Sequence, residues 1–140
     1  MISVTSATKN YILQPELIRK HKKALQWLST TIMWKGELIF FQKALIDYAP
    51  LFYKLKDKKK IDHFENLFLY YSGEVVDSLR SKLRQHENRL ASALKTKNET
   101  STRYFREHDS LMDELSTFSK SYNELKADFL KFISSANKKG

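Results

Sequence analysis

The spacing of large apolar residues in the last third of the chain constrains its fold most. Between residues 104 and 136 these side chains recur in alternating steps of four and three residues. The row consists of Tyr104, His108, Leu111, Leu115, Phe118, Tyr122, Leu125, Phe129, Phe132 and Ala136. A heptad spacing of this kind places its members on one face of an α-helix. We therefore expect a helix over residues 101–136, and Met112, Leu130 and Ile133 widen its face so that it contacts two neighbours.

A second helical pattern is present at the start of the chain. Pro15 suits the first position of a helix and Pro50 should end it, which predicts a helix over residues 15–49. Its apolar row is predicted to be Leu17, His21, Leu25, Leu28 and Ile32, followed by Trp34, Leu38, Phe41, Leu45, Tyr48 and Phe52.

The middle of the chain carries a third pattern, over residues 61–97, with Asp62 as its predicted cap. Its row is Ile61, Phe64, Phe68, Tyr71, Val75, Leu79, Leu83, His86, Leu90 and Leu94. Extra four-residue steps follow Val75, and such a stutter locally unwinds a coiled coil. Gly73 lies beside the stutter, which predicts either a close backbone approach or a slight bend there.

These three patterns predict an all-α protein. Three glycines and two prolines are too few for the turns of a sheet protein of 140 residues. The short connections favour an antiparallel three-helix bundle over residues 15–137, with long helices and the coiled-coil packing of spectrin-like bundles. Residues 1–14 are expected to form an N-terminal arm, either loose or strapped over the first helix.

The composition narrows the location and the chemistry. The chain has no cysteine, which excludes disulfides, thiolate metal sites and cysteine nucleophiles. Residues 1–14 do not read as a targeting segment, and no apolar run approaches the roughly 18 residues of a membrane span. We therefore expect a cytoplasmic protein without a membrane span.

Several short motifs lie on the helical patterns. They are Asp62-His63-Phe64-Glu65-Asn66-Leu67-Phe68, Gln85-His86-Glu87, Glu107-His108-Asp109-Ser110-Leu111, and Tyr122-Asn123-Glu124-Leu125 followed by Phe129 and Phe132. With Trp34 and Glu37, they resemble a family of short uncharacterised bacterial helical-bundle proteins that carry His-Phe-x-Asn-x-Phe in their second helix. The resemblance covers roughly residues 20–135. It implies a cytosolic helical bundle and supplies no catalytic residues.

Histidines on the apolar rows are the candidates for a metal site. His21, His86 and His108 are expected near the same end of the bundle, so a weak metal site is one interpretation. The favoured interpretation is that they are buried or boundary histidines bonded to their neighbours. No Glu-x-x-His pair, phosphate loop or nucleophile elbow is present, so we predict no enzyme activity and no cofactor.

Two surface features suggest partners. The helix over residues 15–49 has more apolar residues than two neighbours should cover, and Ile39, Phe40 and Ile46 form the surplus face. This face favours a non-enzymatic interaction module that forms a homodimer or docks a protein partner. The net charge of +9 is concentrated in a lysine run, which is either a solvated connection or a surface for nucleic acid or another anion. That run, called the basic patch below, is Lys54, Lys56, Lys58, Lys59 and Lys60.

Overall fold

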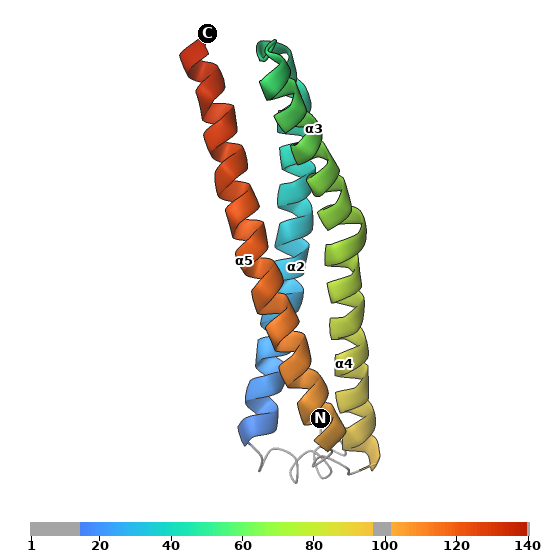
Figure 1. Ribbon diagram of the computed structural model, residues 1–140. Helices are drawn as coiled ribbons and strands as arrows, with labels where there is room; N and C mark the ends of the chain where they lie inside the picture. Colours follow the sequence, from blue (N-terminus) through green and yellow to red (C-terminus); the bar gives the residue numbers. More distant parts are fainter. Residues whose placement is uncertain (1–14, 97–101, 140) are drawn as a thin grey trace. The chain divides into compact units, whose positions relative to one another are not determined.

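The computed structural model describes residues 15–96 and 102–139, and helices account for nearly all of them (Figure 1). In chain order these are α2 (Pro15–Tyr48), a 3₁₀ turn (Ala49–Leu51), α3 (Leu55–Tyr70), a π-helix (Tyr71–Val75), α4 (Val76–Thr96) and α5 (Thr102–Lys139). No strand occurs within these described residues, so the predicted all-α class is confirmed. None of the described helices is long and apolar enough to cross a membrane. The predicted arm, residues 1–14, lies outside the described residues.

The second predicted helix begins earlier than expected, at Leu55 instead of Ile61. Asp57 lies in its first turn, where a carboxylate is favoured by the positive end of the helix dipole. Lysine is also a good helix former. The basic patch therefore lies at the start of α3, and Asp62, the predicted cap, lies inside the helix.

Two compact units make up the chain, and each is described by itself. Of the described residues, unit 1 comprises 15–30, 79–96 and 102–115, and unit 2 comprises 31–78 and 116–139. The boundaries between them fall inside α2, α4 and α5.

The row predicted for the last helix is confirmed residue by residue. All its members, from Tyr104 to Ala136, are buried. Of the three residues expected to widen this face, Leu130 is exposed, whereas Met112 and Ile133 are half-buried.

The predicted row of the first helix is wrong in its first half. Leu25 and Ile32 are exposed, and Ala24 and Thr31 occupy the buried positions instead. The buried row runs every seven residues through Leu17, Ala24, Thr31, Leu38, Leu45 and Phe52. A regular helix keeps one face inward along its length, so small side chains occupy core positions while larger neighbours face outward.

Aromatic side chains form the core of unit 2. The Phe129 ring lies 4.8 Å from Phe68, 5.3 Å from Phe41 and 5.4 Å from Phe64, measured between ring centroids. Trp34 packs edge-on against Phe118 at 4.9 Å. Most aromatic side chains of the described residues are buried or half-buried, whereas Tyr53 and Tyr70 are exposed.

A polar group interrupts the apolar core of unit 2 at Glu37. Its carboxylate accepts hydrogen bonds from the Tyr122 hydroxyl at 2.7 Å and from Lys126 at 2.9 Å. Burial alone raises the pKa of Glu37, but these two hydrogen bonds and the positive charge of Lys126 together outweigh burial and hold the pKa below its usual value. Glu37 therefore stays ionised and joins α2 to α5 in this unit.

The predicted interruption near Val75 is present as the π-helix, in which the Val76 N–H bonds to Tyr71 O. Side chains of α2 bind this wide turn: Lys35 donates to Ser72 O at 2.6 Å, and Gln42 donates to Ser72 Oγ at 3.1 Å. The close backbone approach considered at Gly73 is absent, because a Cβ there would meet nothing within 4 Å.

Candidate functional site

The candidate site is a cluster of polar side chains inside unit 1, between α4 and α5. It rests on a small apolar core of Leu17, Leu90 and Tyr104. The His86 imidazole stacks on the Tyr104 ring, with centroids 4.3 Å apart and planes inclined by 7°. This stacking fixes the plane of the His86 ring, so that its two nitrogens point in defined directions.

Three side chains form a hydrogen-bonded chain through this cluster. His86 Nδ1 lies 2.9 Å from Glu107 Oε1, and His86 Nε2 lies 3.0 Å from His108 Nδ1. His86 is 0% exposed and His108 is 4% exposed. Both histidines therefore obtain hydrogen bonds from protein groups, as buried polar rings require.

The proton positions in this chain follow from the chemistry of its end group. Glu107 also pairs with the Arg89 guanidinium, which favours its ionised, acceptor-only form. His86 Nδ1 must then be the donor, and in the neutral ring Nε2 is the acceptor. His108 Nδ1 therefore donates to His86, and His108 Nε2 is left with a lone pair.

Both imidazoles are held neutral by their surroundings. Burial lowers the pKa of His86, and the charges of Arg89 and Lys20 lower it further, against an opposing effect of Glu87. Burial, His86 and Lys20 together lower the pKa of His108 to about 4, against an opposing effect of Asp109. At neutral pH the pair therefore carries no charge.

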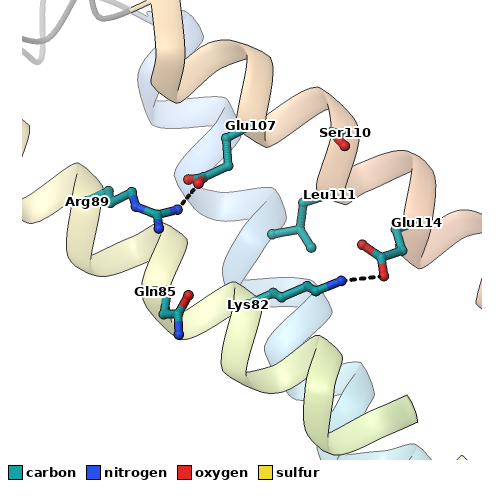
Figure 2. A pocket seen from close by; sticks show the side chains of 7 residues that line it. All are labelled: Lys82, Gln85, Arg89, Glu107, Ser110, Leu111 and Glu114. Atoms are coloured by element: carbon teal, nitrogen blue, oxygen red, sulfur yellow. Dashed lines mark hydrogen bonds and ion pairs between the residues drawn. The ribbon is translucent and has the colours of Figure 1, made fainter.

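Figure 2 shows a pocket between α4 and α5 that Glu107 lines. Two ion pairs span it: Arg89 with Glu107, and Lys82 with Glu114 at 2.8 Å. Gln85 and Leu111 lie between these pairs (Figure 2). Because every charged group drawn there is already paired, this pocket offers no free charge to a ligand.

A second groove lies between α2 and α5, and His108 lines it. Its other lining residues all come from the start of α2, and they are Glu16, Arg19, Lys20, Lys22, Lys23 and Gln26. Lys20 contacts Asp109 at 3.6 Å, and Arg19 pairs with Glu16. The cations outnumber the lining carboxylate, so the groove is positively charged.

The predicted metal candidates come together only in part. His86 and His108 are in contact, whereas His21 pairs with Glu87. Among the described residues, no three histidine or acidic side chains gather as a metal-binding group. Glu107 and His108 bond to opposite nitrogens of the His86 ring, so their donor atoms do not converge on one point.

The predicted interaction residues are prominent on the surface of unit 2. Ile39 is 58% exposed, Phe40 is 66% exposed and Ile46 is 68% exposed. The basic patch is also exposed, and Lys58 lines a hollow together with Tyr53. Binding of nucleic acid at this patch stays a prediction.

Sequence reasoning missed the partners of the histidines. Glu107 and Arg89 were not predicted to join His86, and the groove at the start of α2 was not predicted at all. One signal was available, because Glu107 directly precedes His108 on the α5 row. The ring stacking and the direction of each nitrogen depend on residues far apart in the sequence, so spacing could not reveal them.

Comparison with known proteins adds no relative: no protein-family model, curated protein or solved structure matches this chain. The resemblance drawn from the helical motifs therefore stays a prediction. Some residues that carry it do meet in the structure, since Trp34 and Glu37 both contact Tyr122.

Proposed function

We propose that this chain is a non-enzymatic interaction module that forms a homodimer through the outer face of α2. One observation carries the proposal: Ile32, Ile39 and Ile46 recur every seven residues and are all exposed. Met33 and Phe40 lie beside this row and are exposed as well. Monomeric proteins rarely leave a large apolar patch in water.

The seven-residue period of this outer row favours a helix as the partner that packs on it. Each isoleucine directly follows a member of the buried row, Thr31, Leu38 or Leu45, so α2 carries two apolar faces of the same period. A seven-residue repeat is the pattern by which one helix packs along another. A second copy of α2 presents the same repeat, and a two-fold pair is the commonest way to bury such a face.

Gly36 also favours a second helix as the partner on this face. It lies between Ile32 and Ile39 on the exposed side of α2, and a Cβ there would meet nothing within 4 Å. The missing side chain leaves room for the backbone of a second helix to approach closely. A solvent-exposed glycine in a helix interior otherwise costs about 1 kcal/mol relative to alanine.

The whole chain is further proposed to be an antiparallel three-helix bundle located in the cytoplasm. The order in which residues of neighbouring helices pair along the chain supports this arrangement within each unit. In unit 1, His86 pairs with His108 and the earlier Lys82 with the later Glu114, as in antiparallel helices. In unit 2, Lys35 of α2 bonds to Ser72 in the π-helix, and the later Gln42 bonds to the earlier Phe68 in α3. This is also the order expected of antiparallel helices.

Sedimentation velocity tests the dimer. The unmodified chain should sediment with twice its mass of 16.5 kDa, and Phe40→Lys should return it to a folded monomer. Leu130→Lys is the matched control, because it places the same charge at an exposed apolar position of α5. It should leave the mass of the dimer unchanged.

Two results would overturn the proposal. One is a monomer at all concentrations. The other is a dimer that Phe40→Lys and Leu130→Lys weaken equally. A monomer that unfolds when residues 1–14 are removed would instead assign the outer row to the N-terminal arm.

A further inference from the structure

A buried histidine lines the groove between α2 and α5, beside several cations. His108 is 4% exposed and lines the groove, and its Nδ1 is already used by His86. Within the described residues, its Nε2 has no hydrogen-bond partner. The His108 ring lines a groove of about 410 Å³, whose other lining residues are Glu16, Arg19, Lys20, Lys22, Lys23 and Gln26.

The charges around the ring explain why it is neutral without a ligand. A proton on Nε2 would place a positive charge beside Lys20 and against the His86 ring. Around the pair of His86 and His108 lie Glu87 and Arg89 from α4, Tyr104, Glu107 and Asp109 from α5, and Lys20 from α2. The charged residues of α2 that also line the groove are Glu16, Arg19, Lys22 and Lys23. The nearest carboxylates are engaged, since Asp109 contacts Lys20 and Glu107 pairs with Arg89.

We propose that this groove binds a small oxyanion of the phosphate class, held by Lys22 and Lys23 and by a proton-bearing Nε2 of His108. Arg19 and Lys20, which pair with Glu16 and Asp109, add positive charge beside it. The bound anion adds negative charge to a groove whose lining holds four cations and one carboxylate, Glu16. His108 then takes up one proton from solvent, and its Nε2–H donates to an anion oxygen. His86 continues to accept from His108 Nδ1, so the hydrogen-bonded chain to Glu107 is retained.

Binding and protonation must then favour each other by the same factor. If the anion restores the pKa of His108 from about 4 to its ordinary value of 6.5, affinity rises about eightfold between pH 7 and pH 5.5. Simple attraction to lysines has no such dependence, because their charge does not change over this range.

Calorimetry with sodium sulfate tests the proposal, since sulfate keeps its two charges between pH 5.5 and pH 7. Ionic strength is held constant with chloride. We expect about eightfold tighter sulfate binding at pH 5.5, with about one proton taken up per anion, and an increased His108 pKa in NMR titrations of the ring. Lys23→Gln, at an exposed position in the groove, should weaken binding several-fold.

Lys82→Gln is the matched control, because Lys82 is an exposed lysine of the pocket between α4 and α5. It should leave sulfate binding unchanged. Absence of sulfate binding at pH 5.5, or pH-independent binding that Lys82→Gln weakens as much as Lys23→Gln, would overturn the proposal. Pyrophosphate and a short oligonucleotide then distinguish the source of the phosphate, since only a polymer adds a steep salt dependence.

Discussion

At the scale of single residues, the neutral histidine pair couples the stability of unit 1 to pH. The folded-state pKa of His108 is about 4, whereas an unfolded chain has a histidine pKa of about 6.5. As the pH falls through this window, the unfolded chain gains protons that the folded chain does not. The free energy of unfolding is therefore greatest above pH 6.5 and decreases toward pH 4, by about 3 kcal/mol for this residue.

Urea unfolding at pH 7 and pH 5, without added oxyanion, measures this effect. Replacing both rings, as His86→Leu with His108→Leu, should remove most of the difference between the two pH values. His63→Leu is the control, because His63 is exposed, and it should leave the difference unchanged. An equal pH dependence in the double variant would show that carboxylates elsewhere cause it.

From the sequence, it was possible to predict on which helix face each of these histidines lies, but not which groups it bonds. Their positions on the apolar rows of the second and third predicted helices indicated that His86 and His108 would be buried, and both are. The spacing could not predict that Glu107 and His108 would bond to opposite nitrogens of one ring. That arrangement depends on the register between two helices that are separate in the sequence.

At the scale of elements, the π-helix accounts for the stutter in the second predicted helix. Before it, Phe64 and Phe68 are buried; after it, the buried row resumes at Val76 and Leu79. An uninterrupted heptad from Phe64 would reach residues 75 and 78 instead. The wide turn therefore absorbs one extra residue, and side chains of α2 bind the polar groups that it exposes.

Deleting Gly73 should convert this turn into regular α-helix and keep the later buried row on the same face. The expected cost is about 1 to 3 kcal/mol, because the hydrogen bond from Lys35 to Ser72 O is lost. Deleting Ser81, in the regular part of α4, should instead rotate Leu83 and His86 by about 100° and abolish folding. Circular dichroism with urea unfolding compares the two, and equal losses would contradict the one-residue insertion.

At the scale of the whole molecule, the two units share continuous helices. All three unit boundaries, after Thr30, Ser78 and Leu115, fall within helices and not within connections. Unfolding one unit alone would require α2, α4 and α5 each to end in mid-helix, with unsatisfied backbone groups at every break. We therefore expect the two units to unfold together.

The two tryptophans test this expectation, since Trp27 belongs to unit 1 and Trp34 to unit 2. In Trp27→Phe the fluorescence reports unit 2, and in Trp34→Phe it reports unit 1. Within each variant, the urea midpoint from fluorescence should equal the midpoint from circular dichroism. An earlier fluorescence transition in one variant and a later one in the other would show independent units.

The sequence by itself determined the all-α class and the buried row of α5, because both depend on spacing along one segment and on the pitch of the α-helix. Only the tertiary structure decided which of two neighbouring rows of α2 faces inward. Leu25 and Ile32 are more apolar than Ala24 and Thr31, yet the smaller pair is buried. Burial at these positions depends on the space left by segments that are distant in the sequence, and no local pattern contains that information.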